Sequence, residues 1–230
     1  MTASTSIPAR SAILGRLRAA APEQPLPTPN LTAYHQGPFG QGASGDLLMA
    51  FETAAQSWRA EVLHADPTTW ATTVREALDR HGCRRVAIGT GGPQHAELVP
   101  ALSGLALRRF DQPLEQWKAE LFDTIDAGIT SALAGVADTG SLILQPGPAE
   151  PRTLSLVPPL HIAVLRSSTI FASLAAAMAT LHPEADMPTN LLLVSGPSKT
   201  ADIQQVLAYG AHGPKQLVIV LIHDPKEVRP

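Results

Sequence analysis

The sequence predicts an α/β fold with a single open, mainly parallel sheet and flanking helices. Two segments, 191–194 and 217–222, are continuously apolar, which is typical of central strands covered on both faces, because half-exposed strands alternate apolar and polar residues. A stretch of helical character, 200–209, lies between them. We therefore expect a right-handed β-α-β unit, with the loop after Val194 at the carboxyl end of the sheet, where ligand sites of such folds gather.

The N-terminal part of the chain has a different composition. An amphipathic helix is expected over 9–21, followed by a Pro-rich strap over 22–30 and a Gly-rich loop over 37–45. Closely spaced prolines forbid a helix and favour an extended segment. We therefore divide the chain into 1–45, a helix with a Pro/Gly-rich strap, and 46–230, the α/β domain.

Within the domain, helices and strands are expected to alternate. Asp66 followed by Pro67 is typical of a helix start, and Gly82 of the end of that helix. The expected helices are 46–64, 67–81, 113–126, 168–181 and 200–209. The expected strands are 85–89, 105–109, 127–134, 141–145, 161–165, 191–195 and 217–222.

Composition excludes several classes of protein. With 230 residues, 44% of them hydrophobic and 16% charged, the chain is long enough for one ordinary core and is not disordered. A net charge of -3 gives no attraction to nucleic acid or to anionic lipid. No apolar run approaches the ~18 residues that span a bilayer, so we expect neither a nucleic-acid partner nor a membrane span.

The chain contains one cysteine, Cys83. A single thiol can form no disulfide within the chain and cannot build a zinc or iron-sulfur site. The N-terminus lacks a basic segment followed by an apolar one, so no secretory signal is visible. We therefore expect a cytoplasmic protein with no metal site.

The segment Ser195–Ile203 (SGPSKTADI) offers an expected anion site. If it leads from a strand into a helix, its hydroxyls, backbone N–H groups and Lys199 ammonium can converge on one anion. It is not a Walker A loop, because two residues rather than four separate Gly196 from Lys199. Helix capping is the alternative, with Thr200 as the N-cap residue and Asp202 in the first turn.

Two further segments contain groups that can transfer protons. His212 is expected in a tight loop within 209–214, and an imidazole titrates near neutral pH, although a histidine there can also be a mere surface group. Asp138 lies in 137–142 (ADTGSL), which fits either a tight hairpin or a loop lining a cleft. An aspartic protease would need a second copy of this Asp-Thr-Gly triplet, and the α/β pattern disagrees with that fold.

Other common motifs are incomplete or absent. Gly89-Thr90-Gly91-Gly92 would need a glycine at position 94 to form a dinucleotide loop, and that position is Gln94. The sequence contains neither an HExxH pair nor a GxSxG nucleophile elbow. A nicotinamide cofactor site and the common hydrolase classes therefore lose support, and the chain has no redox cofactor motif.

Four ordered motifs together resemble the LUD domain, and the chain is similar to the lactate-utilization protein C family (LutC, also called YkgG, formerly DUF162), over about 127–222. The motifs are ADTGS at 137–141, SLVPPLHI at 155–162, SGPSKTADI at 195–203 and GAHGP at 210–214. The family usually has a glutamate where Asp138 stands, so the carboxylate is kept on a shorter side chain.

The resemblance implies a fold similar to the NagB/RpiA/CoA-transferase group. It also implies membership of a bacterial three-component system that oxidises L-lactate to pyruvate, with cysteine-rich and iron-sulfur proteins as partners. Because one cysteine cannot hold such clusters, we expect no cofactor in this chain and iron-sulfur clusters in the partner subunits. The leading hypothesis is an accessory subunit of that system.

On this hypothesis, a cleft at 195–202 binds a small carboxylate or another anion. Lys199 is the expected charge partner, Ser198 and Thr200 are donors, and Asp138 with His212 forms a possible proton-handling pair. The other expected ligand-binding residues are Thr139, Gly140, Ser141, Gly196, Asp202 and Gly213, and Arg152 and His161 are second-rank candidates.

Two alternatives stay open. The chain can be a stand-alone enzyme of the same fold group that acts on a sugar phosphate, a folate or an acyl-CoA. It can also be a scaffold or regulatory module without chemistry of its own. Fold alone does not decide among these functions.

Overall fold

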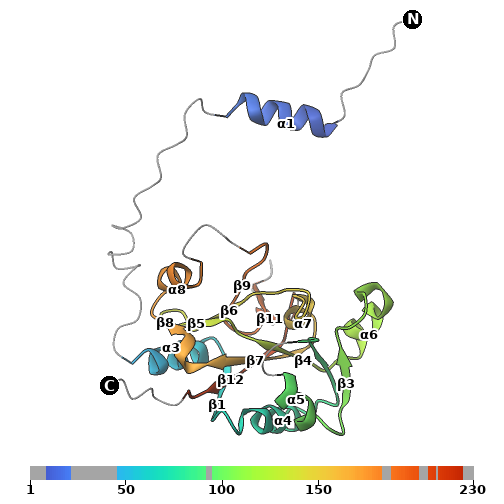
Figure 1. Cartoon of the computed structure of the whole chain (residues 1–230), viewed down its shortest axis with the longest axis vertical. Coiled ribbons are helices and arrows are strands. Elements are labelled where there is room, and N and C mark those ends of the chain that lie inside the picture. Colours follow the sequence, from blue (N-terminus) through green and yellow to red (C-terminus); the bar gives the residue numbers. More distant parts are fainter. Residues whose placement is uncertain are drawn as a thin grey trace, which may run out of the picture.

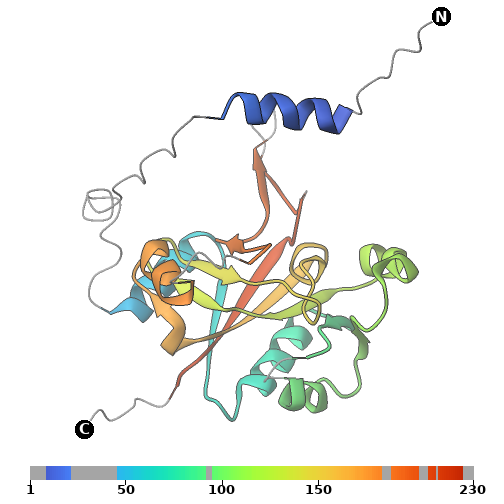
Figure 2. The same ribbon diagram turned by 45° about the horizontal axis from the view of Figure 1, so that its top comes forward.

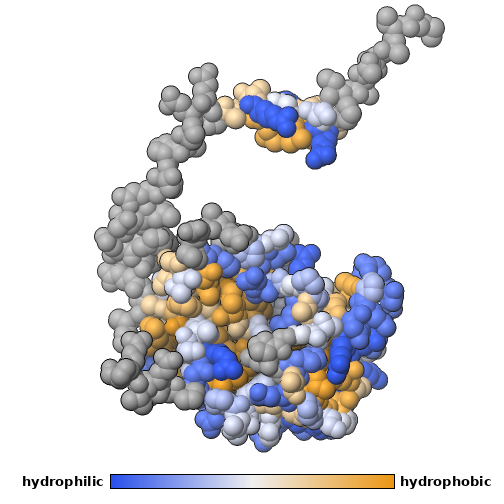
Figure 3. Space-filling model, viewed as in Figure 1, coloured by the Kyte–Doolittle hydropathy of each residue, from blue (hydrophilic) through white to orange (hydrophobic). Residues whose placement is uncertain are grey.

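The computed structural model describes residues 9–21, 46–91, 95–182, 188–201, 207–210 and 212–224. The expected strap at 22–30, the Gly-rich loop at 37–45 and Asp202 lie outside the described residues. Helix α1 (Ala9–Ala19) forms within the expected 9–21 segment, and none of its residues is buried. Apolar and basic side chains lie side by side on it (Figure 3).

Within the described part of the chain, six parallel strands form the central sheet, in the order β1-β12-β7-β4-β2-β3 (Figure 1). These strands are β1 (Glu61–Ala65), β2 (Arg85–Ile88), β3 (Ala106–Arg109), β4 (Ala127–Ser131), β7 (Leu160–Arg166) and β12 (Gln216–Ile222). This confirms the predicted α/β fold with a mainly parallel sheet and flanking helices.

The strand order reverses between β2 and β4. From β2 the chain adds β3 on one side, whereas from β4 it adds β7 and then β12 on the other. A reversal of this kind leaves a crevice at the carboxyl ends of the two strands, which is where open α/β sheets bind ligands.

Short helices connect the strands, and two of those described, α3 (Leu47–Ser57) and α8 (Leu174–Leu181), begin at a side-chain cap. The Asp46 carboxylate accepts hydrogen bonds from Leu48 N and Met49 N at the start of α3, and Ser173 Oγ accepts from Ala176 N at the start of α8. The helices are α3 (Leu47–Ser57), α4 (Trp70–Arg80), α5 (His95–Ala101), η1 (Leu114–Gln116), α6 (Lys118–Asp123), α7 (Thr153–Leu156), η2 (Ser167–Thr169) and α8 (Leu174–Leu181).

Both faces of the central sheet are covered (Figures 1 and 2). Val218, Val220 and Ile222 pack in the cluster that includes α4 and α5. The alternate residues of β12, which include Ile219 and Leu221, pack on the opposite face in the cluster that includes α3. This two-sided burial explains why the 217–222 segment is continuously apolar.

A second sheet packs on the α3 side of the central sheet. Its described strands are β8 (Ile170–Phe171), β5 (Ala134–Val136), β6 (Ser141–Leu144) and β9 (Leu192–Val194), in that order. Leu142 and Leu144 contribute to the core beside α3, whereas Ile143 packs in a separate cluster with Ala177 of α8. The second sheet therefore lies between the central sheet and α8.

The predicted β-α-β unit over 191–222 is wrong. Strand β9 pairs antiparallel with β6, not with β12, and Leu193 is 53% exposed. The expected helix 200–209 is instead a pair of antiparallel strands, β10 (Lys199–Ala201) and β11 (Leu207–Tyr209). The pairing of β9 was mispredicted because an apolar run shows that a strand is partly buried but not which sheet it joins. The helix was mispredicted because a helix of about ten residues is only marginally stable unless one of its faces packs on the core.

Other boundaries also differ from the predictions. The expected helix 46–64 ends at Ser57, because the chain turns at Arg59, whose φ of 67° is left-handed, and then enters β1. The expected strand 127–134 divides into β4 and β5, and the expected helix 168–181 begins only at Leu174, after its Ser173 cap.

The turn between β5 and β6 requires glycine at Gly140. Its φ is +63°, and an added Cβ would lie 2.2 Å from Ala55 N in the backbone of α3. We expect Gly140→Ala to lower the free energy of unfolding by roughly 3 to 5 kcal/mol, because helix backbone cannot move aside. Urea unfolding of the purified protein measures this loss.

Gly104→Ala is the matched control. Gly104 also has a left-handed φ, +83°, but nothing lies within 4 Å of an added Cβ. The free energy of unfolding of Gly104→Ala should fall by about 1 kcal/mol, which is the cost of the backbone conformation alone. Equal losses for the two variants would contradict the close packing of this turn on α3.

Candidate functional site

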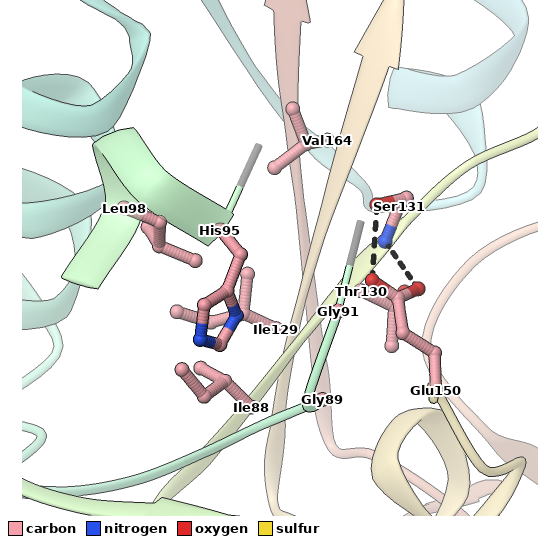
Figure 4. A pocket seen from close by; sticks show the side chains of 10 residues that line it. All are labelled: Ile88, Gly89, Gly91, His95, Leu98, Ile129, Thr130, Ser131, Glu150 and Val164. Atoms are coloured by element: carbon pink, nitrogen blue, oxygen red, sulfur yellow. Dashed lines mark hydrogen bonds between the residues drawn. The ribbon is translucent and has the colours of Figure 1, made fainter. Parts of the chain in front are cut away.

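The crevice at the strand reversal holds a small pocket. Its apolar wall comes from β2, β4, β7 and α5, and its polar side chains come from the end of β4, the loop after β6 and His95 at the start of α5 (Figure 4). We call it the Glu150 pocket; it is lined by Ile88, Gly89, Gly91, His95, Leu98, Ile129, Thr130, Ser131, Glu150 and Val164. Its free volume of about 20 Å³ has room for about one water molecule.

The Glu150 carboxylate is bound by Ser131, the last residue of β4. Ser131 N donates to Glu150 Oε2 at 3.0 Å, and Ser131 Oγ donates to Glu150 Oε1 at 3.0 Å (Figure 4). Burial raises the pKa of Glu150 above its usual value, against the lowering effect of these two hydrogen bonds. A buried carboxyl group with a perturbed pKa in a crevice is typical of functional sites.

The loop that carries Glu150 lies directly on the loop after β2. Thr90 N donates to Ala149 O at 2.9 Å. A Cβ on Gly89 would lie 2.3 Å from Ala149 O and 2.7 Å from Glu150 Cγ, so only glycine allows this approach. Gly89, which did not belong to a complete dinucleotide loop, therefore has another purpose, which is to admit the Glu150 loop.

Thr130, which lines the Glu150 pocket, forms a buried hydrogen bond with His161 of β7. Thr130 Oγ1 and His161 Nε2 are 2.8 Å apart, and both side chains are buried. His161 Nδ1 has no hydrogen-bond partner among the described residues. Complete burial lowers the pKa of His161 to about 4, so this second-rank candidate is neutral at pH 7.

A second, larger hollow lies beside the 195–199 loop. We call it the Lys199 hollow; it has a volume of about 460 Å³ and is lined by Ser57, Trp58, Arg59, Ser195, Gly196, Pro197 and Lys199. Gly196 approaches the end of α3 closely, since an added Cβ would lie 2.6 Å from Trp58 O. The exposed Lys199 side chain and that of Arg59 are its cationic groups.

The structure brings several of the predicted site residues together. Ser141 Oγ is within 2.9 Å of Thr139 Oγ1 and 2.7 Å of Ser195 Oγ, which links the turn before β6 to the end of β9. Ser198 N donates to Pro214 O at 2.8 Å, and Gly213 packs against the Ser198 side chain. The motifs at 137–141, 195–203 and 210–214 are therefore joined through these contacts.

Other predicted residues are placed differently. Asp138 and His212 are exposed, and in the described part of the chain neither side chain forms an ion pair or hydrogen bond. Thr200 lies in the middle of β10 and is not a helix N-cap, and Asp202 is outside the described residues. Arg152 lines a small hollow that it shares with Glu150 and Ser131, away from Lys199.

The Lys199 hollow and the Glu150 pocket lie at opposite ends of the strands. Ser198 contacts Pro214, which precedes β12, and an adjoining hollow that shares Arg59 and Pro197 is lined by the beginnings of β1 and β12. The loop after Val194 is therefore at the amino end of the central sheet, and the expectation of the carboxyl end is corrected. The cause is the antiparallel pairing of β9 with β6.

Sequence reasoning missed Glu150. It selected glycine loops by their fit to nucleotide motifs, whereas Gly89 matters here as a close contact for Ala149. The available signal was a carboxylate between two prolines, Pro148 and Pro151, in a loop that follows an apolar strand.

Three further findings concern metals, thiols and membranes. Over the described ranges, no group of three His, Cys, Asp or Glu side chains is arranged to hold a metal ion. Burial, with a smaller effect of Asp126, raises the pKa of Cys83 to about 11, so the thiol stays protonated and a poor nucleophile. None of the described helices has the length and apolar character needed to cross a bilayer.

Comparisons of the sequence and of the structure with known proteins point to the same family. A family model described as the LUD domain matches residues 48–222. An uncharacterized protein of Neisseria meningitidis serogroup B is 37% identical, over 93% of each chain. "Lactate utilization protein C" of an Exiguobacterium species is 31% identical, over 80% of this chain and 81% of that one. The crystal structure of a DUF162 family protein from Deinococcus radiodurans is similar with a TM-score of 0.57 and 25% identity, over 76% of this chain and 96% of that one.

The buried His161 makes stability depend on pH. Below pH 6.5 the unfolded chain takes up a proton at this residue, whereas the folded chain does so only near pH 4. The free energy of unfolding should therefore fall as the pH is lowered from 6.5 to about 4, by roughly 3 kcal/mol from this group. Urea unfolding at about pH 7 and about pH 4.5 measures the difference.

His161→Gln should lack this part of the pH dependence, because an amide does not titrate in this range. His212→Gln, at an exposed position, should keep it and is the matched control. The same pH dependence in the wild type and in His161→Gln would contradict the assignment.

Proposed function

The chain belongs to the LUD domain family, and on this premise we propose that it is an accessory subunit of a bacterial lactate-utilization system, which oxidises L-lactate to pyruvate. One observation carries the proposal: the relative named lactate utilization protein C matches most of both chains and not a shared segment alone. A match of this extent favours a shared role over a shared fold.

The role is accessory because the redox centres of this system belong, in our proposal, to other subunits. An iron-sulfur cluster needs several thiolates, and the chain has one cysteine, whose thiol is buried and protonated. We assign the clusters to cysteine-rich partner subunits and place the complex in the cytoplasm.

The Lys199 hollow is the proposed site for a small carboxylate. Lactate and pyruvate each have one carboxylate group, and the Lys199 ammonium can donate charge-assisted hydrogen bonds to it. Ser195 and Arg59 line the same hollow. Because Thr200 is in a strand, side-chain charge takes the place of the helix N-terminus that the sequence suggested.

Deletion of the gene for this chain should abolish growth of its host on L-lactate, in a background without another L-lactate dehydrogenase. Growth on pyruvate should continue, because pyruvate lies beyond the proposed oxidation step. The measurement is the growth rate on each carbon source, with the gene restored on a plasmid as the control.

Unchanged growth on L-lactate would overturn the proposed function. Affinity purification of the tagged chain from lactate-grown cells tests the partner assignment in the same strain. Cysteine-rich proteins with bound iron are expected to co-purify, and recovery of the chain alone and without iron would contradict that assignment.

Lys199→Ala should weaken binding of L-lactate or pyruvate by about tenfold or more, because it removes a charge-assisted hydrogen bond. Titration calorimetry with each acid measures the change. Lys118→Ala on α6, also an exposed lysine, is the matched control and should bind as the wild type does. Equal affinity of the two variants would exclude the Lys199 hollow as the carboxylate site.

A further inference from the structure

Ser131 presents two donors to both oxygens of one carboxylate. Its backbone N–H and its Oγ each lie 3.0 Å from a different oxygen of Glu150. Hydrogen bonds to an ionised acceptor are stronger than neutral ones, and pairing both oxygens also fixes the orientation of the group. The end of β4 is therefore shaped to hold a carboxylate.

The carboxylate that fills this position belongs to the chain itself. Glu150 lies in the 145–152 loop between β6 and α7, and beyond Cα its side chain consists of Cβ, Cγ and a carboxylate carbon. Propanoate has the same skeleton, and lactate and pyruvate differ from it only at the carbon next to the carboxylate. A free acid of two or three carbons can therefore take the place of the Glu150 side chain.

The surroundings suit exchange of one carboxylate for another. The position is at the strand reversal, where open α/β sheets bind ligands. Ile129 and Val164 form an apolar wall beside it (Figure 4), against which a methyl group can pack. Ser131 donates to Glu150 through one backbone N–H and one hydroxyl, and both donors are equally available to a free carboxylate once Glu150 has left.

We propose that the Glu150 pocket is a second binding site, specific for a small monocarboxylate, in which Glu150 occupies the place of the ligand until the ligand displaces it. Glu150 Cγ and Ala149 O both pack closely on Gly89, so we expect displacement of Glu150 to shift Ala149 and break the hydrogen bond from Thr90 N to Ala149 O. Ligand binding is then coupled to movement of the 145–152 loop. The choice of lactate and pyruvate as probes rests on the proposed function. The proposal that the Glu150 pocket binds a small carboxylate does not.

The first test removes the internal competitor. Acetate, pyruvate and L-lactate are titrated into the wild type and Glu150→Ala by calorimetry, with Glu115→Ala, an exposed glutamate of η1, as the matched control for charge. Glu150→Ala should bind acetate about tenfold more tightly than the wild type, because an occupied site lowers the apparent affinity. Adding Ser131→Ala should remove most of this gain.

The second test uses the wild type, so it holds even if Glu150→Ala fails to fold. Saturating acetate or pyruvate should speed hydrogen exchange at the Thr90 amide, which loses its bond to Ala149, while the Ser131 amide stays protected. No change in Thr90 exchange would overturn the proposal, and so would a folded Glu150→Ala that binds acetate no more tightly than the wild type.

The two proposals fail separately. If the deletion strain grows normally on L-lactate but acetate shows the expected gain in Glu150→Ala, then the lactate role is wrong and the carboxylate receptor stands. If that strain cannot grow on L-lactate, and neither the gain in acetate affinity nor the faster Thr90 exchange is seen, then the Glu150 pocket is not a carboxylate site and the lactate-utilization role stands.

Discussion

The architecture depends on covering both faces of a parallel sheet whose central strands are apolar on each side. On one face α4 and α5 supply the cover. On the other, α3 and the second sheet cover one part, and a cluster that includes α6 and α7 covers Ala87 of β2. To build that sheet the chain leaves the central sheet twice, once between β4 and β7 and once between β7 and β12. Both candidate sites lie on these two excursions.

The excursions return to opposite ends of the strands. The first passes through the 145–152 loop, which brings Glu150 onto Ser131 at the carboxyl end of β4. The second passes through the 195–199 loop, which meets the residues before β12 at the amino end. The excursions that build one covering layer thus form both the small Glu150 pocket and the larger Lys199 hollow with its cationic side chains.

The sequence predicted local features well and long-range partners poorly. The continuous apolar run 217–222 predicted a strand covered on both faces, and the structure confirms that burial. Periodicity does not show which strand pairs with 192–194, because apolar side chains fit either sheet. We assigned this strand to the central sheet, and the 195–199 loop was therefore expected at the carboxyl end of the strands, whereas it lies at the amino end. The resemblance placed the motifs of Ser141 and Ser195 in one cleft, and these two hydroxyls do meet. Glu150 was missed because its role depends on the close approach of Gly89 to Ala149.

The second sheet draws β5 and β6 from the first excursion, and β8 and β9 from the second, so that β8 and β9 flank the β5-β6 hairpin. During synthesis the hairpin leaves the ribosome with both of its edges unpaired. Unpaired strand edges are templates for association with other chains, and pairing distant segments slows folding. The interval before β8 and β9 emerge is therefore the stage at which this protein is most exposed to aggregation.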